Sequence, residues 1–181
     1  MELTTKQLEE AIIFATEKHE GMVRKGDGRP YIMHPLSVMQ HLYKYKKSKN
    51  INLLAIATVC HDLLEDTKTT TTEIVRLFGL NVASIVTELT TDEEKKNKVG
   101  KAQYLLTKML GMSSYALVIK LCDRLDNIMD MKSMSDSFIK KYIKETNFIL
   151  DGLCEDDARK LTRTHKCLIR DIRKTIKNYE K

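Results

Sequence analysis

The stretch INLLAIATVCHDLLEDT (51–67) decides the fold of this chain. Its first part is apolar on almost every side of a helix, which is typical of a helix at the centre of a core. We expect one continuous helix over about 51–65. Its C-terminal end carries His61, Asp62, Glu65 and Asp66, and ionisable side chains at the end of so apolar a helix need compensating partners.

Strong turn formers are scarce in the rest of the chain, which has 7 Gly and 2 Pro among 181 residues. This composition argues against a sandwich or barrel of short strands. Apolar residues instead recur at helical spacing, so the sequence predicts an all-α bundle of about eight to ten helices. Besides the central one, helices are expected at about 5–19, 35–47, 70–78, 81–90, 99–110, 113–131, 135–152 and 156–179.

Two segments depart from helical periodicity. The first, GMVRKGDGRPYIMHP (21–35), contains both prolines, and we interpret it as an ordered loop because it lacks the Ser/Gly repetition of a flexible linker. Pro35 suits the first turn of the next helix, and His34 directly before it favours extended backbone. The second, TTDEEKKNK (90–98), is expected to be an exposed loop.

The charge and the cysteine content indicate which partners and which cellular location to expect. The formal net charge is +6, and residues 156–181 account for most of it with nine Lys/Arg against four Asp/Glu. Such an excess on one terminal helix predicts a solvated basic face, with a nucleic-acid or acidic-partner patch as the alternative. The 4 cysteines show no metal-finger spacing, and no signal peptide or membrane span is recognisable, so we expect a cytoplasmic protein.

The acidic end of the central helix indicates a metal site. Three carboxylates this close repel one another unless a cation compensates them, and a divalent metal would also hold His61 as a neutral ligand. Asp123 and Asn127 lie one turn apart on another apolar helix, in KLCDRLDNI (120–128), and His34 ends the Gly/Pro loop. Taken singly, a histidine such as His34 is more often a core or capping residue, and an aspartate such as Asp123 is usually a surface salt-bridge partner; together they indicate a metal site assembled by folding.

The remaining histidines and two of the cysteines are interpreted as structural. The histidines His19, His41 and His165 are expected in core or capping positions. Cys60 and Cys122 each precede a candidate ligand, and we interpret both as small buried residues rather than thiolate ligands.

Three segments resemble a known family. In order and approximate spacing, RKGDGRPYIMHP (24–35), HDLLEDT (61–67) and KLCDRLDN (120–127) are similar to the signature segments of the HD-domain hydrolases of the RelA/SpoT family, in particular the stand-alone small alarmone hydrolases (metazoan SpoT homolog-like). The resemblance implies an all-α HD-type phosphohydrolase domain over 1–155. Residues 156–181 would then form a basic C-terminal helix packed on the same domain.

The resemblance also implies roles for residues. It implies four metal ligands: His34, His61, Asp62 and Asp123. Glu65 and Asp66 would orient and deprotonate the attacking water. The implied substrate contacts are Arg24, Lys25, Asn127 and Tyr142. The implied cofactor is Mn²⁺, and two imidazoles with two carboxylates also suit Fe²⁺ or Zn²⁺. The implied reaction removes the 3′-pyrophosphate from guanosine 3′,5′-bis(diphosphate), ppGpp.

Two alternatives remain open. Asp126 stands where the family often has His, and with the lysine-rich segment 91–101 it leaves room for another phosphorylated nucleotide such as NADPH. The basic C-terminal helix leaves room for a non-catalytic nucleotide-binding or nucleic-acid-binding protein. The intact Glu65–Asp66 pair favours an enzyme acting on a small phosphorylated nucleotide. Nucleic acid is an unlikely partner, and no membrane partner is expected.

Overall fold

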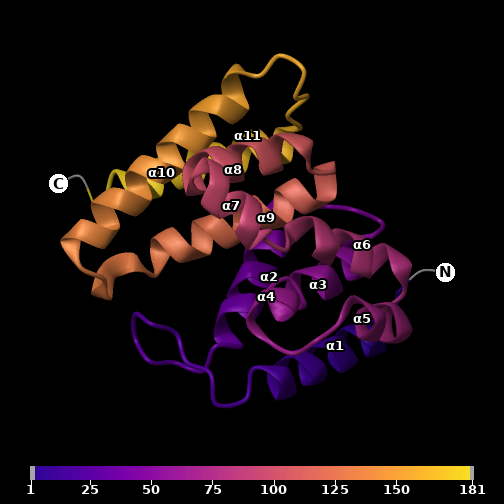
Figure 1. Ribbon diagram of the computed structural model, residues 1–181. Coiled ribbons are helices and arrows are strands. Elements are labelled where there is room, and N and C mark those ends of the chain that lie inside the picture. Colours follow the sequence, from indigo (N-terminus) through magenta and orange to yellow (C-terminus); the bar gives the residue numbers. More distant parts are fainter. Residues whose placement is uncertain (1–2, 180–181) are drawn as a thin grey trace. The chain divides into compact units, whose positions relative to one another are not determined.

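The computed structural model describes residues 3–179, and within them the protein is helical, as predicted (Figure 1). The described part contains eleven α-helices and one 3₁₀ helix; its β structure is limited to one isolated bridge between Val23 and Pro30. Contacts divide the chain into two units, the first up to Thr90 and the second from Thr91. None of the described helices is long and apolar enough to cross a membrane.

The first unit is built around the predicted central helix. That helix, α3, contacts α1, α2 and α6, and from Leu54 to Val59 every one of its residues is buried. The helices of this unit are α1 (Thr5–Lys18), α2 (Met33–Tyr45), α3 (Ile51–Val59), α4 (Leu63–Asp66), α5 (Thr71–Phe78) and α6 (Leu80–Leu89). A capping box at Thr70 starts α5, and Gly79 ends it with a φ of 86°, a conformation that favours glycine.

The expectation of one helix over 51–65 was wrong, because the chain breaks between α3 and α4. The carbonyl of Thr58 accepts a hydrogen bond from the Nδ1–H of His61 at 2.7 Å. In a continuous helix that carbonyl would accept from the backbone N–H of Asp62. The backbone N–H of Leu63 instead donates to the carbonyl of Cys60 at 3.1 Å, a tighter turn. His61 and Asp62 therefore lie in a turn between two helices.

The second unit runs from α7 to α11, and α9 is its most buried helix. This helix contacts α11, α8 contacts both α7 and α10, and α10 also contacts α11. The elements are α7 (Glu93–Val99), α8 (Lys101–Gly111), α9 (Ser114–Met129), η1 (Met131–Ser133), α10 (Asp136–Glu155) and α11 (Arg163–Ile176). The buried side of α9 runs from Ala116 to Ile128 and leaves little of the helix in contact with water.

Two expectations in the second unit were wrong. The segment 90–98 is not a loop: Asp92 caps the helix α7, in which Glu93 pairs with Lys96 and Glu94 with Lys98. Such pairs stabilise a helix that is polar on every side and buries no residue, which apolar periodicity cannot reveal.

The last helix starts later than predicted. A capping box formed by Thr162 and His165 starts α11 at Arg163, and 156–162 is a loop. Arg159 in that loop donates hydrogen bonds to the backbone carbonyls of Leu110 and Met112. This basic residue therefore holds the loop in place and is not part of a solvated basic face. Glu180 and Lys181 lie outside the described residues, and the domain boundary at 155 stays a prediction.

Candidate metal centre

The turn between α3 and α4 presents an imidazole and a carboxylate side by side. His61 is almost completely buried, and its Nε2 lies 3.1 Å from Oδ2 of Asp62. Because a backbone carbonyl can only accept, the 2.7 Å contact with Thr58 assigns the proton of the neutral ring to Nδ1. The lone pair on Nε2 then faces the carboxylate.

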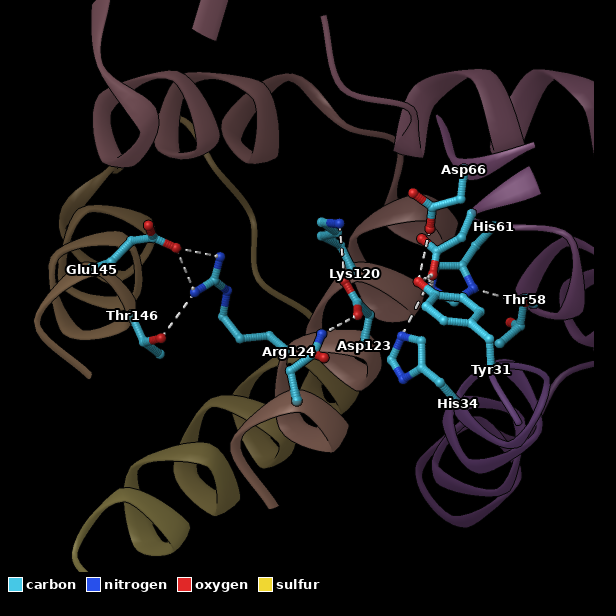
Figure 2. Close-up of polar contacts among 12 residues, drawn as sticks. Tyr31, His34, Thr58, His61, Asp66, Lys120, Asp123, Arg124, Glu145 and Thr146 are labelled. Atoms are coloured by element: carbon cyan, nitrogen blue, oxygen red, sulfur yellow. Dashed lines mark hydrogen bonds and ion pairs between the residues drawn. The ribbon is translucent and has the colours of Figure 1, made fainter. Parts of the chain in front are cut away.

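A second imidazole reaches the same carboxylate from the start of α2. The backbone N–H of His34 donates to the carbonyl of Tyr31 at 2.9 Å, which fixes the entry of the chain into the helix. Its Nε2 lies 3.6 Å from Oδ2 of Asp62, and its ring meets the His61 ring edge to face at 5.2 Å between centroids. Figure 2 shows the two histidines turned toward one another. Both side chains are buried, as is expected of ligands and not of solvated histidines.

The chemistry of these donors fits a divalent transition metal. Two ring nitrogens and a carboxylate oxygen converge, and lone pairs facing one another at such distances need a proton or a metal ion between them. The Nδ1–H to carbonyl bond of His61 is the outer contact by which metal-bound histidines are commonly oriented. A mixed nitrogen and oxygen set suits Mn²⁺, Fe²⁺ or Zn²⁺.

The acidic pair lies on α4, beside these donors. Asp66 keeps the one-turn relation to Asp62 that the sequence predicts, since its backbone N–H donates to the carbonyl of Asp62 at 2.9 Å. Glu65 and Asp66 are both exposed, so a substrate or water molecule can reach their carboxylates.

Sequence reasoning gave no role to Tyr31, which the structure places on this acidic pair. Its hydroxyl lies 2.8 Å from Oδ2 of Asp62 and 2.8 Å from Oδ2 of Asp66 (Figure 2). Burial and the two neighbouring carboxylates raise the pKa of this phenol, so it stays protonated and able to donate. The signal available in the sequence was that Tyr31 is the one Tyr, Phe or Trp residue of the Gly/Pro loop.

The Gly/Pro loop forms the ordered turn that was predicted, but the expectation of extended backbone at His34 was wrong, because helix α2 already begins at Met33. Arg24 starts a tight turn, in which its backbone N–H donates to the carbonyl of Arg29 at 2.8 Å and its carbonyl accepts from Gly28 at 3.0 Å. Gly28 adopts a φ of 73°, which side chains other than glycine rarely adopt. Lys25 is exposed and Arg24 is half-buried on this turn.

In the second unit, the candidate ligand Asp123 is held by two neighbours on its own helix. Lys120 lies 2.9 Å from its Oδ2, and the amide of Asn127 donates to its Oδ1 at 2.6 Å. Asp123 therefore forms the salt bridge that its alternative interpretation predicts. Asp126 is also buried, which is unusual for a carboxylate.

Beside Asp123, Arg124 is a buried cation that sequence reasoning missed. Both terminal nitrogens of its guanidinium lie 3.3 Å from Oε1 of Glu145, and one of them donates to the hydroxyl of Thr146 at 2.9 Å (Figure 2). Its guanidinium carbon lies 5.1 Å from the ring centre of Tyr142, the predicted substrate contact. An arginine on a helix this apolar needs a buried partner, and that requirement was the available signal.

The structure also bears out the two buried-cysteine interpretations. Cys60 and Cys122 are completely buried, and burial raises the pKa of both thiols, that of Cys60 to about 12. Neither is poised as a thiolate near neutral pH. Among the structural histidines, His19 and His165 are buried, and His165 caps α11.

Fold and site together define an all-helical protein with a His–His–carboxylate cluster suited to a divalent metal. The family described as "HD domain" matches residues 11–153. The chain therefore belongs to the HD domain family.

Individual relatives agree with this assignment. "Guanosine-3′,5′-bis(diphosphate) 3′-pyrophosphohydrolase MESH1" of Homo sapiens is 31% identical over 176 residues, 94% of this chain and 97% of the relative. "Guanosine-3′,5′-bis(diphosphate) 3′-pyrophosphohydrolase" of Spiroplasma citri is 36% identical over 133 residues, covering 70% of this chain. The chain spans only 17% of the length of that bacterial protein.

A solved structure confirms the all-α fold. It is described as "A metazoan ortholog of SpoT hydrolyzes ppGpp and plays a role in starvation responses". The two structures superpose with a TM-score of 0.78 at 22% identity, over 96% of this chain and 97% of that one.

Proposed function

We propose that this protein is a divalent-metal-dependent hydrolase that removes the 3′-pyrophosphate from ppGpp. The observation that carries the proposal is the convergence of His34 and His61 on Asp62, in a chain whose relatives are named for this reaction. Water forms the new bond to phosphorus, the bond from phosphorus to the 3′ oxygen breaks, and the products are guanosine 5′-diphosphate and pyrophosphate.

In this proposal the metal ligands are His34, His61, Asp62 and Asp123, and the metal is Mn²⁺. When bound, the ion supplies Lewis-acid activation of the attacking water and of the phosphoryl group. The support from the first unit is the donor set and its outer contact, the Thr58 carbonyl on His61. The support for Asp123 is the family resemblance and its burial.

The chain's own residues would then divide the work. Glu65 and Asp66 are accessible carboxylates that accept the proton of the attacking water. Arg24 and Lys25 on the tight turn neutralise phosphate charge, a task for which Arg offers paired N–H donors. On the second unit, Asn127 and Tyr142 contact the nucleoside.

The test is hydrolysis of ppGpp by the purified protein with Mn²⁺, with the products separated by ion-exchange chromatography. We expect guanosine 5′-diphosphate and pyrophosphate in equal amounts from the wild type, and loss of activity together with Mn²⁺ binding in His61→Ala. Asp157→Ala is the matched control, since Asp157 is exposed in the loop before α11. Full activity of His61→Ala refutes the metal assignment, whatever the substrate.

NADPH is the second candidate substrate, and the buried Asp126 beside Asn127 is the observation that favours testing it. The lysines of α7 favour it less, because Lys95, Lys96 and Lys98 each pair with an acidic neighbour on the same segment. Parallel assays with ppGpp and NADPH, each with Mn²⁺, separate the two substrates. The free cysteines support the expected cytoplasmic location, which stays part of the proposal.

A further inference from the structure

One hydroxyl group joins the two carboxylates of the first unit that have different predicted tasks. Tyr31 lies 2.8 Å from Asp62, a predicted metal ligand, and 2.8 Å from Asp66, a predicted proton acceptor. In Figure 2 the Tyr31 side chain lies next to His34 and extends toward Asp66. The hydroxyl carries one hydrogen, so the two contacts share a single donor, and this sharing sets the two carboxylate oxygens relative to each other.

The ring is fixed by its surroundings, so the hydroxyl has a defined position. The ring of His19 packs on it at 4.8 Å between centroids, and the ring of His34 meets it edge to face at 5.9 Å. The backbone N–H of Tyr31 donates to the carbonyl of Met22 at 2.9 Å, and its carbonyl accepts from His34 at 2.9 Å. The loop thus holds Tyr31 at both its ring and its backbone.

Electrostatics explains why a hydroxyl stands here and not an apolar group. Two carboxylates brought onto one oxygen repel one another, and a donor between them offsets part of that repulsion before any cation is present. A phenylalanine ring would satisfy the contacts with His19 and His34 equally well. The hydroxyl is therefore the part of Tyr31 that acts on the site.

We propose that Tyr31 is a positioning residue, whose hydroxyl orients Asp62 for metal binding and Asp66 for proton transfer. The inference rests on the proposed function for its catalytic part, but its metal-binding part does not require that ppGpp be the substrate. Outer contacts of this kind typically change metal affinity or activity about 10-fold to 100-fold. The loop that carries Arg24 and Lys25, the cationic side chains proposed to contact the substrate, thus also sets the geometry of the metal centre.

The direct test is Mn²⁺ binding by isothermal titration calorimetry, with Tyr31→Phe compared with the wild type. We expect the dissociation constant to rise about 10-fold to 100-fold, with the far-UV circular dichroism and melting temperature close to those of the wild type. Tyr43→Phe is the control, because Tyr43 lies on α2 at the surface and should bind Mn²⁺ as the wild type does. A Tyr31→Phe protein that binds Mn²⁺ with wild-type affinity overturns the proposal.

A double-mutant cycle on kcat tests the contact with Asp66. If Tyr31 acts through Asp66, adding Tyr31→Phe to Asp66→Asn should lower kcat by a much smaller factor than Tyr31→Phe does alone, at saturating Mn²⁺. Factors that multiply in full would show that the hydroxyl acts independently of Asp66. A wild type that binds Mn²⁺ but leaves ppGpp intact refutes the proposed function alone, since the titration still tests Tyr31.

Discussion

Glu145→Ala is expected to destabilise the second unit strongly, because it leaves a buried cation without its counter-ion. The side chains of Arg124 and Glu145 are 4% and 8% exposed. Glu145 accepts from both terminal nitrogens of Arg124 through one oxygen, while Lys101 lies 3.3 Å from the other. The substitution removes the only carboxylate that the described contacts place on the Arg124 guanidinium.

The magnitude follows from this geometry. Removing one partner of a buried ion pair costs about 3–5 kcal/mol of unfolding free energy. We expect the lower end, about 3 kcal/mol, because Thr146 still accepts from Arg124 and both Glu145 contacts share one oxygen. Glu145→Gln keeps a carbonyl acceptor and should cost about 1–2 kcal/mol. Lys101→Ala should cost at most about 1 kcal/mol, since the lysine side chain is half-exposed.

Urea unfolding followed by circular dichroism measures these differences, and hydrogen exchange of the α9 and α10 amides locates the loss. Glu155→Ala is the matched control, because Glu155 is exposed at the end of the same helix. A Glu145→Ala protein within about 1 kcal/mol of the wild type would refute the reasoning about the buried cation. Equal losses in Glu145→Ala and Glu145→Gln would refute the role given to the remaining acceptor.

Three further predictions concern the rest of the chain. Gly79→Ala should cost about 1–3 kcal/mol in urea unfolding, because alanine is strained at a φ of 86° and a ψ of 167° although its methyl group would meet no neighbour, and a neutral result would show that the turn relaxes. Cys154 should react with a thiol reagent at pH 8 in the native protein while Cys60, whose pKa burial raises to about 12, should react only after unfolding; equal rates contradict the burial. Asp92→Ala should speed hydrogen exchange of the Lys95 amide, whereas Asp92→Asn should not. The hydrogen bond from Lys95 lowers the pKa of Asp92, so its contribution is complete above the carboxylate's ordinary pKa and is lost as pH falls through the lower folded value; protection that is unchanged in acid would contradict this.

Local patterns predicted most helices because their causes are local. The capping box of α5, its glycine end at Gly79 and the buried face of α9 all follow from residues within a few positions of one another. Helix α7 escaped prediction for a related reason, since its stability comes from side-chain ion pairs and a cap and not from burial.

The break after α3 escaped prediction because the His61 ring takes part in ending the helix, through its bond to the Thr58 carbonyl. Both the apolar pattern and the helical spacing of Asp62 and Asp66 continue through the break. The bond from the His61 ring to the Thr58 carbonyl, with the tight backbone bonds of the turn, shows that the helix ends. The turn that results presents the His–Asp pair to His34.

By itself, the sequence determined the helical class and the residue types of the candidate metal centre, because periodicity, capping and charge crowding are properties of neighbouring residues. The tertiary structure alone decided which distant side chains meet. It brought Tyr31 to Asp62 across 31 positions and Glu145 to Arg124 across 21. The physical reason is that a buried charge or carboxylate pair requires a partner without specifying where in the chain that partner lies.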